Sequence, residues 1–225
     1  MSFILAVLPP LLIAFYIYKK DKFDKEPKEL ILKSFLFGCL SIIPVVILEL
    51  IFNENIFSNY FVYMFCGVAL VEEGMKYFFL KKYLFDKPEF NEPFDGIVYA
   101  VMVSLGFATV ENLVYVFIYY PDQQISVAIQ RMISAIPLHA SCGVIMGYYV
   151  GLAKFSSSSR ILLLKGVFFA TLLHAIYNYF ILSGNGVYSI LSVLALISGI
   201  YLANRAINIH QLDSQIKNNK DEVIY

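Results

Sequence analysis

The chain has 225 residues, of which 59% are hydrophobic and 15% are charged, and its mean hydropathy is +0.69. Soluble domains carry about 25% charged residues, so the composition excludes an ordinary soluble domain and indicates a membrane protein. Seventeen basic residues balance seventeen acidic ones, so no basic surface for nucleic acid is indicated. The partner that composition predicts is the lipid bilayer.

Seven apolar stretches predict an all-α, polytopic membrane helix bundle, because a helix needs about 20 apolar residues to cross a bilayer. Lysines follow the first stretch instead of preceding it, which is not the pattern of a signal peptide, so we keep it as the first helix. We expect a single transmembrane domain over residues 1–203 and a polar cytoplasmic tail over residues 204–225. The predicted spans are 2–18, 31–52, 60–80, 97–119, 130–153, 161–182 and 184–203.

The basic residues are divided very unequally between the two sides of the predicted bundle. Fifteen of the seventeen lie in the loops after the first, third and fifth helices, at the ends of the helices that border those loops, and in the tail. The other two are Lys76, inside a helix, and Arg131, on the opposite side. Because Lys and Arg concentrate on the cytoplasmic side, we expect the N-terminus outside and the C-terminus in the cytoplasm. The localisation is then the cell membrane, which in a bacterium is the cytoplasmic membrane.

The third predicted helix contains two adjacent carboxylates, Glu72 and Glu73, and a lysine, Lys76, one turn later. A charge at the centre of a bilayer costs about 2.5–3.5 kcal/mol on insertion scales, so such residues usually mark a functional site. An ion pair that neutralises Lys76 explains only one of the two carboxylates. Glu49, near the outer end of the second helix, is expected to reach the interface instead.

Another carboxylate, Glu111, lies inside the fourth predicted helix, four residues after Phe107 and next to Asn112. Small residues that let another helix approach closely precede it at four-residue intervals: Gly96, Ala100, Ser104 and Ala108. Glu111 lies beside that stripe, so we expect it to face protein. Hydrogen bonding between helices is the structural alternative, but the cost of burying a carboxylate favours function.

Two histidines, His139 and His174, lie near the centres of the fifth and sixth predicted helices. His139 continues a stripe of glycines at positions 143, 147 and 151, and His174 shares a face with Asn178. Hydrogen bonding between helices accounts for either histidine taken alone. At a rise of 1.5 Å per residue, however, the predicted topology brings both histidines and the central glutamates into a slab about 10 Å thick. That convergence favours a shared site.

Taken in order, these residues resemble the successive motifs of the PrsW family of intramembrane proteases. The family is distantly similar to the CAAX-prenyl and bacteriocin-processing proteases, which usually have His at the position of Glu111. Residues 18–27 and 95–99 also resemble the family, so the similarity extends from the first helix to the sixth. The motifs are Glu72-Glu73-Gly74-Met75-Lys76, Phe107-x-x-x-Glu111-Asn112, His139-x-x-x-Gly143 and His174-x-x-x-Asn178.

The resemblance implies hydrolysis of a single-span membrane protein, and in PrsW itself this is the first cleavage of an anti-sigma factor. The catalytic residues that we expect are Glu72, Glu73, Glu111, His139, His174 and Asn178, supported by Lys76 and Phe107.

Two mechanisms fit this set. In a metal-free mechanism, Glu72 or Glu73 is the general base, and His139, His174 and Asn178 position water or stabilise the oxyanion. In a metal-dependent mechanism, Glu111, His139 and His174, with Glu72 or Glu73, hold zinc. We favour the metal-free mechanism here, because no single helix supplies the two-ligand spacing of zinc proteases.

Two other classes of protein also bury carboxylates in a membrane. A proton- or ion-coupled transporter is the main alternative, but transporters often show repeated halves, and the chain has no internal repeat. A scaffolding membrane protein does not account for five converging ionisable residues.

Overall fold

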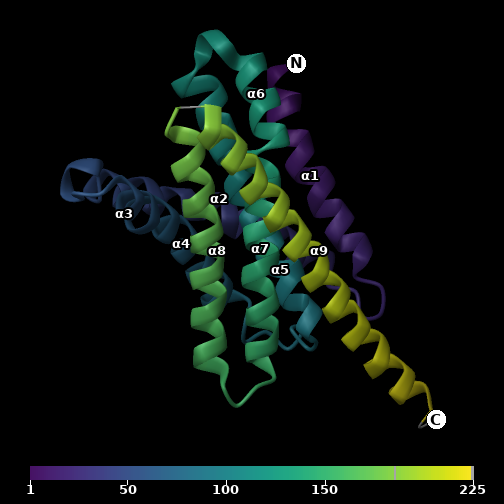
Figure 1. Ribbon diagram of the computed structural model, residues 1–225. Helices are drawn as coiled ribbons and strands as arrows, with labels where there is room; N and C mark the ends of the chain where they lie inside the picture. The colour runs from purple at the N-terminus through teal and green to yellow at the C-terminus, as the bar shows by residue number, and fades with distance from the viewer. Residues whose placement is uncertain (185, 224–225) are drawn as a thin grey trace.

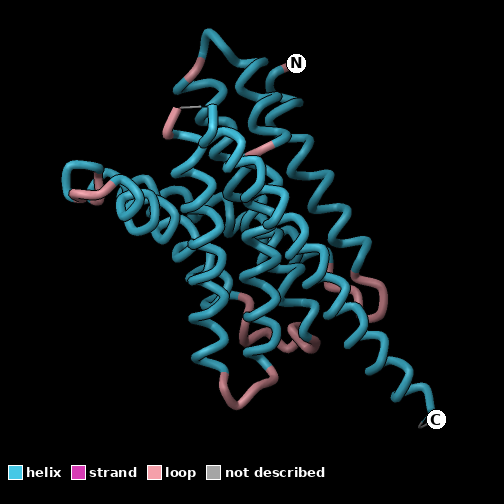
Figure 2. Tube along the Cα trace, viewed as in Figure 1, coloured by secondary structure: helices cyan, strands magenta, loops and turns pink. Residues whose placement is uncertain are grey.

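The computed structural model describes residues 1–184 and 186–223, and its described part is a bundle of helices without strands (Figures 1 and 2). Six helical segments in that part are long and apolar enough to cross a membrane. They are α1 (Ser2–Lys20), α2 (Lys28–Ile51), α5 (Pro93–Val114) with its π-helical extension η3 (Tyr115–Tyr119), η4 (Pro121–Gln123) with α6 (Gln124–Ile133) and α7 (Ala135–Lys154), α8 (Ser159–Leu182) and α9 (Gly186–Val223).

The remaining predicted span, the third (60–80), is also helical. It consists of α3 (Tyr60–Val62), the π-helix η2 (Tyr63–Ala69) and α4 (Leu70–Tyr83), and a short 3-10 helix, η1 (Glu54–Ile56), precedes it. The prediction of an all-α membrane bundle is therefore confirmed, and the predicted number of spans is close. A π-helix inside a longer helix often occurs at a functional site, and η2 ends three residues before Glu72.

α5 lies at the centre of the bundle, and most of its side chains are buried. It packs most closely against α7, where the two predicted stripes of small residues meet. A Cβ atom added to Gly96 would lie 2.5 Å from the carbonyl oxygen of Gly147, and one added to Gly143 would lie 2.8 Å from Oγ of Ser104. The missing side chains therefore let the two backbones touch, as small-residue stripes do in membrane proteins.

We expect Gly147→Ala to destabilise the protein by about 1–3 kcal/mol, as overpacking usually does. The new methyl group would lie 2.6 Å from Cα of Ile97, so α5 and α7 must move apart. Thermal melting of purified protein in detergent measures this effect. Gly186→Ala is the matched control, because nothing lies within 4 Å of a Cβ atom there. Equal melting temperatures for the two variants would contradict the close packing.

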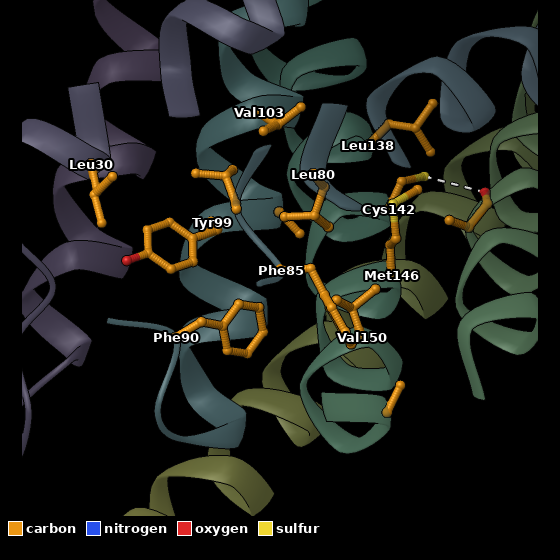
Figure 3. Close-up of a cluster of buried hydrophobic side chains, with 14 of the residues drawn as sticks. Leu30, Leu80, Phe85, Phe90, Tyr99, Val103, Leu138, Cys142, Met146 and Val150 are labelled. Carbon is orange, nitrogen blue, oxygen red and sulfur yellow. Dashed lines mark hydrogen bonds between the residues drawn. The ribbon is translucent and has the colours of Figure 1, made fainter. Parts of the chain in front are cut away.

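A hydrophobic core joins α2, α4, α5, α7 and α8 (Figure 3). Leu80 lies one helical turn after Lys76, while Leu138 and Cys142 flank His139 in sequence, and all three side chains are buried. The Cys142 thiol donates a hydrogen bond to the carbonyl oxygen of Ala170 on α8, at 3.5 Å. This core therefore surrounds the charged residues of α4 with apolar side chains.

α9 continues well past the predicted end of the last span. Residues 204–223, which the sequence predicts as a polar tail, extend this helix, and its end points away from the bundle (Figure 1). Ala203 and Ile207 are buried against α5 and α7. One turn later, Nε2 of His210 lies 3.0 Å from the carbonyl oxygen of Tyr148. The first turns of the predicted tail therefore pack against the bundle.

The loop between α1 and α2 contains two buried carboxyl groups, Asp21 and Glu26. Asp21 accepts a hydrogen bond from the backbone N–H of Glu26 at 3.0 Å, and Glu26 accepts one from the hydroxyl of Tyr99. Burial raises the pKa of Asp21 to about 6 and the pKa of Glu26 to about 7. Ordinary pKa values for these groups are about 4, so the folded protein binds protons at Asp21 and Glu26 that the unfolded chain has released.

We therefore expect the stability contributed by this loop to fall as the pH rises from about 4 to about 7. The sign follows because a group whose pKa is higher in the folded state favours folding only while it is protonated. Glu26→Gln should reduce the pH dependence of the melting temperature, and Asp122→Asn, at an exposed position, should not. A parental melting temperature that does not fall over this pH range would contradict the assignment, and so would a Glu26→Gln variant with the same pH dependence as the parent.

The start of α1 and the end of α9 lie at opposite ends of the bundle (Figure 1). Reporter fusions at Lys82 and at the C-terminus should give a cytoplasmic signal, and a fusion within residues 53–59 an exterior one, because of the distribution of Lys and Arg. A cytoplasmic signal from the 53–59 loop would invert the predicted topology.

Candidate catalytic centre

α4 contributes three charged residues that are almost completely buried: Glu72, Glu73 and Lys76. Nζ of Lys76 lies 3.2 Å from Oε2 of Glu72 and 2.8 Å from Oε1 of Glu73. The spacing of three and four residues along the helix places all three on one face. Two carboxylates share one ammonium group, so the negative charge on this face exceeds the positive charge, as the sequence suggests.

Both predicted histidines lie against this face. Nδ1 of His174, from α8, lies 2.9 Å from Oε1 of Glu73, and its Nε2 lies 4.0 Å from Oε1 of Glu72. Nδ1 of His139, from α7, lies 3.1 Å from Nζ of Lys76. The two imidazole rings meet edge to face with centroids 5.1 Å apart. Three helices therefore bring the predicted histidines and the glutamate pair into one buried cluster.

Phe107, from α5, covers one side of the cluster. Nζ of Lys76 lies 4.1 Å from the centroid of its ring, and the ring contacts His139 edge to face at 5.6 Å. A desolvated cation over an aromatic face is attracted by about 2 kcal/mol. The supporting role expected for Phe107 is thus the orientation of Lys76 and His139 and the exclusion of water from that side.

Glu111, from α5, lies on the far side of the His139 ring from Lys76. Its Oε2 is 2.9 Å from Nε2 of His139, and it accepts a hydrogen bond from Nη2 of Arg131 on α6. The Glu111 side chain remains 17% exposed, whereas the residues of the cluster are at most 5% exposed. Glu111 therefore lies nearer the surface than the cluster and contacts the ring nitrogen of His139 that faces away from Lys76.

Two predicted site residues are placed differently from the expectation. Glu111 does not belong to the group of residues whose donor atoms converge, although the sequence groups it with the metal ligands. Asn178 is half-buried one turn after His174. No hydrogen bond of its side chain is recorded in the described part of the chain. It lies four residues after His174 on α8 and therefore shares its face.

Three residues that lie near the site, Arg131, Asn112 and Glu49, have no assigned role in the prediction from the sequence. Arg131 binds Glu111, and Asn112 accepts a hydrogen bond from Nε of Arg131 at 2.6 Å. Glu49 is half-buried and lies within electrostatic range of Glu72 and Glu111, and not only at the interface. One signal was available for Arg131: it is the one basic residue on its side of the predicted bundle, where a buried carboxylate needs a partner.

Four buried residues offer donor atoms for a metal ion: Glu72, Glu73, His139 and His174, with one atom from each lying within 4.8 Å of the others. Within the described residues, no other such group is found. Oε2 of Glu73 is buried without a hydrogen-bond partner, and such an atom is costly unless something binds it. Carboxylate oxygens and imidazole nitrogens are ligands of zinc, so the donor set fits a metal.

Comparison with known proteins places the chain among membrane proteases. The model of a family described as "PrsW family intramembrane metalloprotease" matches residues 26–203. Relatives named "Protease PrsW" include one from Geobacillus kaustophilus, 37% identical over 194 residues that cover 84% of each chain. One from Clostridioides difficile is 36% identical, covering 80% of this chain and 79% of the relative. One from Bacillus subtilis is 30% identical, covering 92% and 95%. No solved structure matches the chain.

Proposed function

The chain belongs to the PrsW family and is an intramembrane protease, and we propose that the buried cluster of Glu72, Glu73, His139 and His174 is its catalytic centre. The enzyme is a multi-pass membrane protein that acts on membrane-protein substrates, and these relatives do not support the transporter alternative. One observation carries the proposal: two carboxylates and two imidazoles converge within 4.8 Å inside an apolar bundle.

We infer that Glu73, His139 and His174 hold a divalent metal such as zinc, and that Glu72 lies beside it. The reason for favouring a metal-free mechanism was that no single helix carries two ligands at zinc-protease spacing. The cluster removes that reason, because α4, α7 and α8 each contribute to it. The description of the family as metalloproteases also supports the inference. When bound, the metal supplies Lewis-acid activation of a water molecule and of the scissile carbonyl group.

Glu72 is the residue that we assign as general base. Its Oε1 lies 4.0 Å from Nε2 of His174, outside hydrogen-bond distance, so this oxygen is free to accept a proton from water. Glu73 is held by both Lys76 and His174 and is completely buried, which suits a fixed ligand. Glu72 then gives the proton to the leaving amine, as a general base and acid in succession.

Lys76 is assigned to balancing the charge of the glutamates, and Asn178 is assigned to binding the substrate. Lys76 places its ammonium group 3.2 Å from Glu72 and 2.8 Å from Glu73 and so offsets part of their negative charge in this buried site. Asn178 lies one turn from His174 and offers an amide N–H₂ group to the substrate carbonyl or to the developing oxyanion. Glu111 is assigned to the orientation of His139 and not to metal binding.

We further propose that the substrate is an anti-sigma factor with a single membrane span, cut first by this enzyme. The family resemblance of the motifs supports this assignment. Co-reconstitution of the purified protease with such a substrate in liposomes tests it, with the appearance of a shortened substrate as the readout. An anti-sigma factor that the active protease leaves intact would contradict this substrate, whereas cleavage that persists unchanged in the double variant Glu72→Gln, Glu73→Gln would mean that the proteolytic centre is elsewhere or absent.

A further inference from the structure

Arg131 makes more contacts than charge neutralisation requires. It lies on α6, and its side chain is only 12% exposed. Its Nη2 donates to Oε2 of Glu111, its Nε donates to Oδ1 of Asn112, and its guanidinium carbon lies 4.0 Å from the centroid of the Tyr115 ring. The planar guanidinium is thus fixed by an aromatic face and by two acceptors in different directions.

The second acceptor is fixed in turn by the first helix. Nδ2 of Asn112 donates to the carbonyl oxygen of Ala6, at 3.1 Å. Because an Asn side chain has one acceptor oxygen and one donor nitrogen, this bond leaves the oxygen of Asn112 facing Arg131. A lysine would present a single ammonium group and lacks the fork of donors that binds two acceptors at once.

The hydrogen bonds around His139 determine where its proton lies. Lys76 can only donate, so Nδ1 of His139 accepts from it, and the imidazole proton is on Nε2. Nε2 then donates to Oε2 of Glu111, the same oxygen that Arg131 binds. Each donor has an acceptor, so the chain from Arg131 to Lys76 is consistent with one tautomer of His139.

We propose that Arg131 is a positioning residue that acts through Glu111. It holds the carboxylate against Nε2 of His139 and thereby keeps the Nδ1 lone pair of His139 directed into the catalytic cluster. Carboxylates that hydrogen-bond a ligating histidine typically change metal affinity or activity 10–100-fold when they are lost. The consequence for catalysis rests on the proposed function, whereas the tautomer of His139 does not.

The test is histidine-selective ¹⁵N NMR of the full chain in detergent micelles after treatment with chelator. The protein has three histidines, and the variants His174→Gln and His210→Gln assign the signals. In the parent protein, His139 should show a protonated Nε2 and an unprotonated Nδ1. In Arg131→Met, the signals of His139 should change to those of a mixture of tautomers. In Arg131→Lys, which keeps the charge, the change should be smaller.

Arg160→Met is the matched control, because Arg160 is exposed on α8, and it should leave the spectrum of His139 unchanged. A spectrum of His139 that stays in the single Nε2–H form in Arg131→Met would overturn the proposal. If Arg131→Met does not accumulate as folded protein, Arg131→Lys decides: an unchanged His139 spectrum in that variant would equally overturn it.

Cleavage kinetics give a second readout. Arg131→Met should lower kcat by about 10–100-fold with little change in KM, because Arg131 contacts the catalytic histidine only through Glu111. A rise in KM with an unchanged kcat would overturn the positioning role. If Arg131→Met changes the His139 spectrum but Glu72→Gln and Glu73→Gln leave cleavage intact, the proposed function fails while the positioning of His139 stands.

Discussion

Exchanging Glu73 for Gln is expected to lower the rate of substrate cleavage by about 100-fold or more, because Glu73 is assigned as a ligand of the metal that would activate the water molecule and the scissile carbonyl group. The Glu73 carboxylate pairs with both Lys76 and His174 and is completely buried. Gln keeps its size but loses its charge and one acceptor oxygen. The measurement is the initial rate of cleavage in liposomes at equal amounts of folded protein.

Glu54→Gln is the matched control for this variant, since Glu54 is an exposed glutamate in η1. It should cleave at the parental rate. If Glu73→Gln also retained the parental rate, with a normal melting temperature, Glu73 would have no place in the catalytic centre. A loss of folded protein would instead be detected as a lower melting temperature, and Glu72→Gln then serves as the second test.

Replacing Lys76 with Met is expected to destabilise the metal-free protein by about 3–5 kcal/mol. Lys76 is 1% exposed and contacts Glu72, Glu73 and His139. Its removal leaves two carboxylates buried without a cation, and breaking a buried ion pair on one side typically costs this much. Thermal or denaturant unfolding in detergent after treatment with chelator measures the effect.

A divalent metal should restore part of the stability that Lys76→Met loses. It supplies positive charge to the same carboxylates, and a ligand at 100 times its Kd stabilises the folded state by about 2.7 kcal/mol. Lys82→Met, at an exposed position of the same helix, is the control and should lose little. An unchanged melting temperature in Lys76→Met would argue against the stabilising role of its ion pairs with Glu72 and Glu73. A melting temperature that zinc does not raise would argue against a metal bound beside these two carboxylates.

The sequence predicted the fold, and it pointed to the residues that the structure gathers in the buried cluster, because membrane helices leave strong signals. Stretches of apolar residues set the spans, and the stripes around Gly96 and Gly147 predicted that another helix approaches each of them closely. In the structure, α5 and α7 approach each other there. A buried charge such as Glu73 is costly enough to be noticed without other information.

Other features depend on contacts between distant segments, which the spacing of residues along the sequence does not show. Arg131 is predicted at the outer end of the fifth span. In the structure it lies on α6, which brings its side chain to Glu111, twenty positions earlier in the chain. Glu111 itself was grouped with the metal ligands, because spacing along one helix does not show which side of His139 it faces. The polar sequence after Asn204 gave no indication that α9 continues to Val223 and packs against α7 through His210.

The most direct test of the catalytic centre is to follow metal content and cleavage together on one purified sample. We expect about one zinc or similar divalent ion per chain, lost with activity on treatment with chelator and regained with activity on its return. His174→Ala should lose both, because it removes one of the three proposed ligands. Metal-free protein that cleaves at the full rate, with or without chelator, would contradict a metal centre. It would favour the metal-free mechanism, in which a glutamate is the general base without a metal.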